Sequence, residues 1–298
     1  MRKLGYEKRK NRMGLVFIAP WVLGMALLFI LPLAQLLLYS FTRRVYFDEP
    51  LNLTGFEQYA RLFTKDAYSL RLLIDSIVGI ANPGVLLQTV YITILSLFIA
   101  YILKNKFFGR TAARALFFLP VIVTSGIVIK ILSGDIMASM MMSGEKASIM
   151  IRSIDLTQFM IRSGLPLSVS DLLSNLIDNI FNLTWRSGVQ ILLLLAGLQT
   201  VPPNLYEAAS IDGATGWETF WFVTFPMVSP VLLVTAVYTL IEGFSDYNNE
   251  FQQSIISYAR AQDFSYSAAL SWVYFIVSLI LVGALLLMTR KRMVYLAD

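Results

Sequence analysis

The most compact set of polar side chains lies near the end of a long apolar run. Glu242, Ser245 and Asp246 stand at positions i, i+3 and i+4, which share one face of a helix. Tyr238 precedes them by about one turn and Asn249 follows by about one turn. Carboxylates and an aromatic ring can together bind the hydroxyl groups and the apolar ring faces of a hydroxyl-rich solute. We therefore interpret this set as a candidate binding surface for such a solute.

A second polar set precedes another apolar run. It consists of Asn182, Trp185, Arg186 and Gln190. Two interpretations stay open, because Trp and Arg that anchor a helix at a membrane interface show the same pattern as residues that line a solute pathway. The carboxylates of the first set have an alternative too, an ion pair with Arg186 or with a basic residue of another chain.

Catalysis is disfavoured by the residue types that the chain lacks. Its 298 residues include no histidine and no cysteine, which removes the commonest general base and metal ligand and all thiolate chemistry. The carboxylates are scattered, so an intramembrane enzyme is a weak hypothesis. No Gly-x-x-x-x-Gly-Lys-Ser/Thr loop is present, so any ATP must be hydrolysed by another polypeptide. We expect no catalytic residue, no metal site and no cofactor bound by this chain.

Membrane spans are the elements that must position these residues. The chain is 57% hydrophobic and 14% charged, with a mean hydropathy of +0.66, whereas a soluble domain carries about 25% charged residues. A span needs about 20 apolar residues. Six runs qualify: Met13–Phe41, Pro83–Leu103, Ala115–Gly134, Ser187–Tyr206, Thr219–Ile241 and Phe264–Thr289. We predict an all-α polytopic membrane protein with six transmembrane helices.

The distribution of basic residues predicts the orientation. An even number of spans leaves both termini on one side, and 13 of the 24 basic residues lie in the two tails and the link after the second span. Lys and Arg near spans stay cytoplasmic, so both termini are predicted to be cytoplasmic. The net charge of +5 is then a consequence of topology and gives no reason to expect nucleic acid. The first span is too long for a signal peptide, so we expect it to be retained as an anchor.

Two segments on the predicted outer side are longer than turns. Segment 42–82 has apolar residues spaced for one or two amphipathic helices at the membrane surface, namely Phe56, Tyr59, Leu62, Phe63, Tyr68, Leu72 and Leu73. Segment 135–180 is the second, and its role stays open. Both segments are either a docking face for an external partner or a packing layer over the outer helix ends.

A short polar break at 202–218 separates two charge-free runs, and its residues predict two helices with a tight turn. Pro202-Pro203 ends the preceding helix, and Asn204 with Glu207 matches a capping box for a helix over Leu205–Asp212. Gly213 can supply the left-handed residue that ends this helix. A second capping box follows at Thr215 and Glu218. Such an ordered elbow either presents a surface to a soluble partner or is a compact loop between helices.

The elbow resembles a known motif. The order Glu207-Ala208-Ala209, three residues, Gly213, nine residues, Val223, one residue and Phe225-Pro226 is similar to the EAA loop of binding-protein-dependent ABC importer permeases of type I. The usual ending is Ile-x-Leu-Pro, so Val223 and Phe225 are conservative departures. The wider sequence from Leu195 to Ala214 is similar to the sugar permease branch, the MalF-like proteins.

Other segments match that branch in the same order, so the resemblance covers nearly the whole chain. These are Leu31-Pro32, Tyr39-Ser40-Phe41, Gly55-Phe56, Gln58-Tyr59, Phe107-Phe108-Gly109-Arg110, Arg114 to Pro120 and Ser267 to Ser271. Segment 135–180 matches only weakly.

The resemblance implies a permease subunit that works in an assembly. The expected partners are a second, MalG-like permease subunit, two cytoplasmic ATPase subunits that use ATP and Mg, an extracytoplasmic solute-binding protein, a sugar substrate and membrane lipid. The elbow is implied to contact the ATPase as the coupling helix, through Tyr206, Glu207, Ala208, Ala209, Asp212, Gly213 and Ala214. Alternating access of the two permeases would carry the sugar across the membrane. The polar set near Glu242 and the set near Arg186 would line its pathway.

The resulting division of the chain has five parts. They are a cytoplasmic tail 1–12, a first helix 13–41, an extracytoplasmic segment 42–82, a permease core 83–289 and a cytoplasmic tail 290–298. The core holds five helices at about 83–103, 115–134, 187–206, 219–247 and 264–289, with the extracytoplasmic loop 135–180 and the coupling loop 202–218. Alternative functions are import of a non-sugar solute by the same class of permease, or secondary transport without an ATPase.

Overall fold

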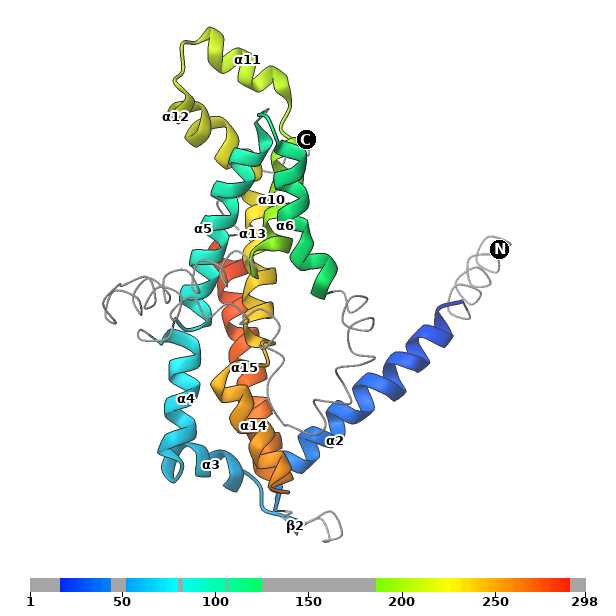
Figure 1. The fold of residues 1–298 in the computed structure, drawn as a ribbon. Coiled ribbons are helices and arrows are strands. Elements are labelled where there is room, and N and C mark those ends of the chain that lie inside the picture. Colours follow the sequence, from blue (N-terminus) through cyan, green and yellow to red (C-terminus); the bar gives the residue numbers. More distant parts are fainter. Residues whose placement is uncertain (1–16, 44–51, 80–82, 106, 125–185, 290–298) are drawn as a thin grey trace, which may run out of the picture. The chain divides into compact units, whose positions relative to one another are not determined.

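The computed structural model describes residues 17–43, 52–79, 83–105, 107–124 and 186–289, with side chains omitted for residues 118–124. These residues are mainly helical (Figure 1). By their contacts they form two compact units. The first unit contains the described residues up to Val85 together with Phe244–Gly283. The second contains those of Leu86–Gly243 together with the described residues from Ala284 onward. The predicted segments 1–12, 135–180 and 290–298 lie outside the described residues.

Four helices among the described residues are long and apolar enough to cross a membrane. They are Phe17–Ser40, Val85–Lys104, Gly216–Phe244 and Phe264–Thr289. A fifth candidate is a broken pair, Gly188–Gln199 and Pro203–Ile211, whose axes differ by 65°. The predicted span Ser187–Tyr206 is therefore not one straight helix, because Pro202 and Pro203 interrupt it. Six spans and cytoplasmic termini stay predictions.

The first unit begins with the helix Phe17–Ser40, which contains the π-helix η1 (Ala26–Ile30) and continues as α2 (Leu31–Ser40). A two-residue antiparallel pair follows, β1 (Thr42–Arg43) with β2 (Asn52–Leu53). This pair is a small exception to the all-α prediction. Beyond it, segment 42–82 forms two helices as its spacing predicts, α3 (Glu57–Thr64) and α4 (Ala67–Val78).

Two further helices complete the first unit, α14 (Glu250–Arg260) and the greater part of α15 (Phe264–Thr289). Asn249 starts α14, because its side-chain oxygen accepts hydrogen bonds from the backbone N–H groups of Phe251 and Gln252. The core of the unit is apolar and aromatic. Its fully or largely buried residues are Leu62, Leu72, Leu73, Phe244, Phe251, Tyr266, Leu270 and Tyr274.

The second unit has its core where α5 (Val85–Lys104), α10 (Gly188–Gln199) and α13 (Phe225–Phe244) pack. The buried core residues are Ala100, Leu103, Ile191, Leu194, Leu195, Leu198, Val201 and Val228. A Cβ on Gly197 would lie 2.9 Å from side-chain carbons of Val231, so glycine permits the close approach of α10 to α13. Helix α6 (Arg110–Thr124) packs on α10.

Between α10 and α13 the chain forms the elbow that the sequence predicts (Figure 1). It consists of α11 (Pro203–Ile211) and α12 (Gly216–Thr219), and it leads through the π-helix η3 (Phe220–Thr224) into α13. Among the described residues, the π-helices η1 and η3 each end two residues before a proline, Pro32 after η1 and Pro226 after η3. A proline has no N–H and its ring crowds the preceding turn, so a wider π turn relieves that conflict.

Candidate functional site

The turn of the elbow is held by backbone hydrogen bonds alone. Gly213 has φ +78°, a conformation that other residues rarely adopt. The N–H of Gly213 donates to the carbonyl of Ser210 at 3.2 Å, and that of Ala214 donates to the carbonyl of Ala209 at 2.9 Å. These two bonds form a Schellman motif. The predicted helix-ending role of Gly213 is confirmed.

The second half of the elbow is held by a capping box. The Thr215 hydroxyl oxygen accepts from the N–H of Glu218, and the Glu218 carboxylate accepts from the N–H of Thr215. The box predicted at Asn204 and Glu207 is wrong. Helix α11 begins at Pro203, two residues before the predicted start, and its first residue is held without a side-chain cap. Proline is suited to this position because its φ is already helical and it has no N–H to satisfy.

One face of α11 is exposed and made of small and acidic residues. Glu207 and Ala208 are exposed, and Ala209 is half-buried. None of the described residues forms a hydrogen bond or an ion pair with the Glu207 carboxylate. Ile211, at the end of the helix, is 86% exposed. A short rigid helix with small side chains, a free carboxylate and an apolar tip can enter a groove on another protein.

The opposite face of α11 contacts the rest of the unit through Tyr206. Its hydroxyl oxygen accepts a hydrogen bond from Lys104 Nζ, at the end of α5, at 2.5 Å. The same hydroxyl lies 3.1 Å from Thr224 Oγ1, in η3. Asp212 and Gly213 are exposed, so of the residues predicted to couple, Tyr206 is the one that reaches two other helices.

Aromatic side chains surround the base of the elbow. Trp217 packs edge-on against Trp221 with ring centroids 5.6 Å apart, and Trp221 contacts Phe225 at 5.1 Å. Trp217 and Phe222 are largely exposed. Tryptophan is enriched where a span meets the headgroup region. These residues open the long candidate span Gly216–Phe244, where such an aromatic set is expected.

The polar set near Glu242 is divided by the end of a helix. Glu242 lies in α13, and its carboxylate accepts a hydrogen bond of 2.6 Å from the side-chain amide of Gln190 in α10. Gln190 is fully buried, and its side-chain oxygen has no hydrogen-bond partner among the described residues. Tyr238 lies one turn before Glu242 and is 38% exposed. The structure thus joins one member of each predicted polar set.

The prediction that Glu242, Ser245 and Asp246 share one helical face is wrong, because α13 ends at Phe244. Ser245 and Asp246 lie in the turn that follows, where the Asp246 carboxylate accepts from the N–H of Asn248. Asn249 belongs to the next helix, because it caps α14. Gly243 before this turn and the short polar side chains within it favour a helix stop over continuation.

The other members of the second polar set precede α10 in the sequence. Asn182 and Trp185 lie outside the described residues, and Arg186 lies two residues before α10.

A polar stripe on α5 was missed by the sequence interpretation. Its members are Thr89, Thr93 and Ser96, all buried. Their spacing of four and three residues matches the helical period, so this stripe could have been predicted from the sequence. Among the described residues, no cluster of three carboxylates could hold a metal ion.

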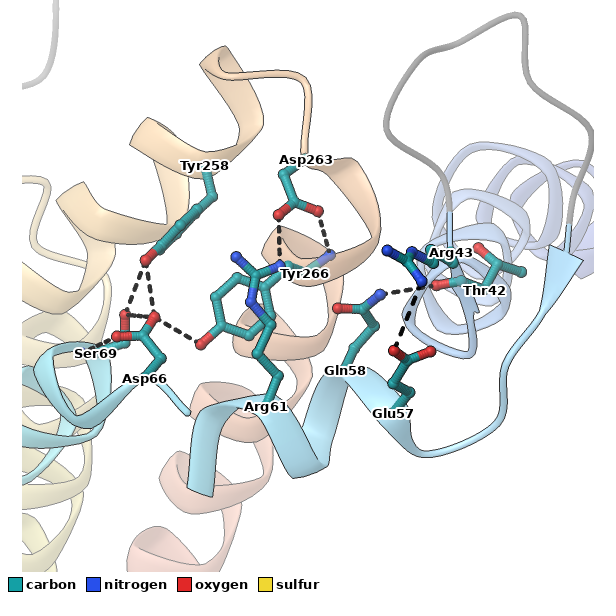
Figure 2. Close-up of polar contacts among 10 residues, drawn as sticks. All are labelled: Thr42, Arg43, Glu57, Gln58, Arg61, Asp66, Ser69, Tyr258, Asp263 and Tyr266. Atoms are coloured by element: carbon teal, nitrogen blue, oxygen red, sulfur yellow. Dashed lines mark hydrogen bonds and ion pairs between the residues drawn. The ribbon is translucent and has the colours of Figure 1, made fainter. Parts of the chain in front are cut away.

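In the first unit, segment 42–82 is joined to α14 and α15 by a polar cluster that we call the Asp66 junction (Figure 2). It consists of Asp66, Ser69, Tyr258 and Tyr266, with the ion pair Arg61–Asp263 beside it. The hydroxyl groups of Tyr258 and Tyr266 each donate to Asp66 Oδ2 at 2.8 Å. The N–H and hydroxyl of Ser69 donate to the same carboxylate at 3.0 and 2.7 Å.

The Asp66 carboxylate is stabilised in its charged form. Burial by itself would raise the pKa of Asp66, but the hydrogen bonds from Ser69, Tyr258 and Tyr266 outweigh it and lower the pKa to about 2. Beside it, Arg61 Nη1 lies 2.7 Å from Asp263 Oδ2, and the Arg61 guanidinium lies 3.9 Å from the Tyr266 ring centroid. These contacts favour the packing interpretation of segment 42–82 over that of a free docking face.

Comparison with known proteins gives consistent results. Residues 92–293 match the family model described as "Binding-protein-dependent transport system inner membrane component". The probable ABC transporter permease protein YesP of Bacillus subtilis is 25% identical, over 99% of this chain and 94% of that protein. The multiple sugar-binding transport system permease protein MsmF of Streptococcus mutans is 24% identical, over 89% of this chain and 90% of that protein.

A solved structure shares the fold. It is the crystal structure of a bacterial alginate ABC transporter in complex with a periplasmic protein that holds an alginate pentasaccharide. The matching chain superposes with a TM-score of 0.58 at 17% sequence identity, covering 97% of this chain and 98% of the other. At this identity the match identifies the fold alone.

Proposed function

Because this chain belongs to the family of inner membrane components of binding-protein-dependent transport systems, we propose that it is the permease subunit of an ATP-driven carbohydrate importer. It is a multi-pass protein of the prokaryotic cell membrane. Oligosaccharides are the favoured cargo. In this proposal the chain forms half of the translocation pathway and has no enzymatic activity of its own.

The observation that carries the proposal is the construction of the elbow. An exposed helix that ends in a Schellman motif and continues into a capped helix is stiff on both sides of its turn. It leads on either side into helices long or apolar enough to span the membrane. A stiff exposed helix between two spans suits the transmission of force from a soluble subunit. We therefore assign the face of Glu207 and Ala208 to an ATPase subunit.

The assembly that we propose has several partners. They are a second, MalG-like permease, two ATPase subunits that bind the ATP and Mg, and an extracytoplasmic solute-binding protein. Membrane lipid would surround the spans, and the exposed Trp217 and Phe222 support a headgroup contact at the base of the elbow. This arrangement requires that α11 face the cytoplasm and that the loop before α4 face outward.

For the cargo, the supporting residues are polar groups inside the second unit. Glu242 and Gln190 form a hydrogen-bonded pair with an unused amide oxygen on Gln190. Polar groups within spans are costly against lipid and usually face a cavity. Tyr238 adds an aromatic ring one turn away on α13. We assign these three residues to the solute pathway, together with Arg186.

The name of the relative from Streptococcus mutans, a multiple sugar-binding transport system permease, supports carbohydrate as the cargo class. A non-sugar solute carried by the same class of importer is the second candidate. Calorimetry of the cognate solute-binding protein against a panel of maltose, maltotriose, raffinose, alginate trisaccharide, glycerol 3-phosphate and an amino acid mixture separates the two. Heat of binding with a saccharide supports the proposal, whereas binding of only the last two contradicts it.

A charge reversal tests the assignment of α11. In proteoliposomes that contain the whole transporter, Glu207→Lys should reduce ATP-dependent sugar import at least about tenfold, since a lost charge-assisted contact costs roughly 1.5–3 kcal/mol. Copurification of the ATPase with the permease should fall in parallel. Glu250→Lys is the matched control, because Glu250 is an exposed glutamate in the first unit. Normal import by Glu207→Lys would contradict the assignment, and import without nucleotide would favour a secondary transporter.

The proposed orientation has a direct test, because the chain has no cysteine. Single cysteines introduced at Ser210, in α11, and at Lys65, before α4, are both at exposed positions. A membrane-impermeant maleimide added to intact spheroplasts should label Lys65→Cys and leave Ser210→Cys unlabelled until the membrane is opened. The reverse pattern would overturn the proposed topology.

A further inference from the structure

The contacts of Tyr206 extend the proposed function in one specific way. The residue lies on α11, on the face opposite the exposed Glu207 and Ala208, and is half-buried. Its hydroxyl group is the meeting point of three elements, α5, α11 and η3. We propose that Tyr206 is a positioning residue that transmits displacement of α11 to the ends of α5 and α13. The inference rests on the proposed ATPase contact of α11.

The link to α5 is charged and doubly anchored. Lys104 Nζ lies 2.5 Å from the Tyr206 hydroxyl oxygen and 3.9 Å from the centroid of its ring. The ammonium group therefore both donates a hydrogen bond and makes a cation–π contact with the same side chain. Lys104 is the last residue of α5. Arg114 donates to the carbonyl of the neighbouring Leu103 at 2.7 Å, which binds this helix end to α6.

The link to η3 has a direction. The Thr224 hydroxyl donates to the carbonyl of Thr219 at 3.4 Å, which uses its only hydrogen. Lys104 donates to the Tyr206 oxygen, so Tyr206 is left to donate its own hydrogen to Thr224 Oγ1 at 3.1 Å. The result is a chain of donors from Lys104 through Tyr206 and Thr224 to the carbonyl of Thr219, the last residue of α12. Thr224 is only 1% exposed, so the bond at this end of the chain of donors is shielded from water.

The Thr224 hydroxyl follows the π register of its helix. Two threonines of α13 donate to the carbonyl four residues earlier, Thr235 to that of Val231 and Thr239 to that of Thr235. Thr224 instead donates to the carbonyl five residues earlier. A π turn contains one residue more than an α-helical turn, and such turns are frequent at functional sites. The Tyr206 hydroxyl thus contacts the side chain that marks this turn at the start of α13.

The consequence is mechanical. A push on α11 that moves Tyr206 must either break its hydrogen bonds or carry Lys104 and Thr224 along. Tyr101, on α5, packs its ring edge-on against Phe220 of η3 at 5.2 Å, which ties the same two elements by apolar contact. Tyr206 adds the polar bond that also includes α11. Removing the hydroxyl should leave α11 able to bind an ATPase while its motion reaches the spans less efficiently.

The test is Tyr206→Phe in the whole transporter in proteoliposomes, with sugar import and ATP hydrolysis measured on the same samples. The number of sugars imported per ATP should fall at least about fivefold, because the variant loses the hydrogen bonds to Lys104 and Thr224 and each lost bond costs about 1 kcal/mol. The matched control is Tyr101→Phe, because the Tyr101 hydroxyl has no hydrogen bond to any described residue. This control should keep the wild-type ratio.

A second variant and a second measurement separate positioning from a merely structural role. Thr224→Val should also lower the ratio, and the double variant Tyr206→Phe/Thr224→Val should be no worse than Tyr206→Phe alone, because both substitutions remove the same bond between Tyr206 and Thr224. Fluorophores on single cysteines at Ser210, in α11, and at Val234, in α13, both exposed positions, report motion on addition of ATP. In Tyr206→Phe the signal at Ser210 should persist and that at Val234 should shrink.

The outcomes are distinguishable. An unchanged sugar-to-ATP ratio in Tyr206→Phe, or undiminished signals at both labelled positions, overturns the inference. A parallel loss of assembly, ATP hydrolysis and import would make Tyr206 a structural residue and overturn it as well. If the wild-type assembly imports no sugar with ATP, or does not bind an ATPase, the proposed function itself fails.

Discussion

The elbow and the Asp66 junction are stabilised in opposite ways. In the elbow, bonds between residues only a few positions apart hold the structure. Backbone bonds hold the turn at Gly213, and the capping box of Thr215 and Glu218 holds the start of α12. At the Asp66 junction, side chains from distant parts of the chain converge on one carboxylate, with sequence separations of 192 residues to Tyr258 and 200 to Tyr266. A local motif can be exposed and still be rigid. A long-range junction holds packed elements together and needs burial to be strong.

This difference suits the two proposed roles. A helix that receives force from another protein must keep its shape while its outer face stays free, and local backbone bonds allow both. The Asp66 junction fastens α3 and α4 to α14 and α15, so that segment 42–82 and the unit it belongs to form one structure. Substitutions in the elbow should therefore change coupling more than stability, and substitutions at the junction should do the reverse.

The largest effect is expected for Gly213→Pro. Proline holds φ near −65°, whereas Gly213 has φ +78°. The Schellman turn cannot form, so ATP-dependent import should fall below about a tenth of the wild-type rate while the chain still inserts. The matched control is Gly216→Pro, because Gly216 is the first residue of α12, where proline is tolerated. Equal import by the two variants would remove the distinction between the elbow and an ordinary loop.

A large effect on stability is expected for Asp66→Ala. The change leaves the hydroxyl groups of Tyr258, Tyr266 and Ser69 without their shared acceptor, and it removes the cap of α4. The free energy of unfolding should fall by about 2–4 kcal/mol. Thermal unfolding of the purified transporter in detergent, followed by tryptophan fluorescence, measures the loss. Asp75→Ala, which breaks only the exposed pair with Arg71, should cost less than about 0.5 kcal/mol.

The same junction predicts a loss of stability in acid. The pKa of Asp66 is lowered to about 2 in the folded state, below the value of about 3.9 for an unfolded chain. A depressed pKa contributes stability that is complete above the unfolded value and disappears as the pH falls through the folded value. The wild-type melting temperature should therefore drop between about pH 4 and pH 2, and this component should be absent in Asp66→Ala. An identical acid profile in both would contradict the role of this carboxylate.

The smallest effect is expected for Thr215→Ala. Loss of an N-cap costs about 1 kcal/mol, and α12 is short and exposed, so the change should stay local. Hydrogen exchange should become about fivefold faster at the first backbone amides of α12, with the global melting temperature unchanged. Ser210→Ala, at an exposed position in α11, should leave those amides unaffected. A fall in the global melting temperature would mean that the elbow is stabilised by more than its local bonds.

Local motifs explain which parts of the site could be predicted from sequence. The helix-ending role of Gly213 and the capping box of Thr215 and Glu218 are confirmed, because each depends on residue types within four positions of one another. The box predicted at Asn204 is wrong for a reason of the same kind. Proline favours the first position of a helix, and Pro203 occupies it. Asn204, the next residue, therefore lies inside the helix and cannot act as its cap.

Long-range contacts explain what sequence interpretation missed. Helical spacing placed Glu242, Ser245 and Asp246 on one face, but spacing cannot say where a helix stops, and α13 ends at Phe244. The bond between Glu242 and Gln190 joins α13 to α10 across 52 residues. Lys104 is one of the basic residues in the link after the second span, which predict only the orientation of the chain. Its contact with Tyr206 lies 102 residues away in sequence, and no local pattern indicates it.

The sequence by itself determined the membrane class, the positions of most apolar helices and the shape of the elbow turn. Hydrophobicity, glycine and capping residues act on their own segment, so their effects can be read without the rest of the chain. Only the tertiary structure decided which side chains meet, as Tyr206 meets Lys104 and Thr224, and as Asp66 meets Tyr258. Those contacts depend on how helices pack within a unit, and packing places residues together that are far apart along the chain.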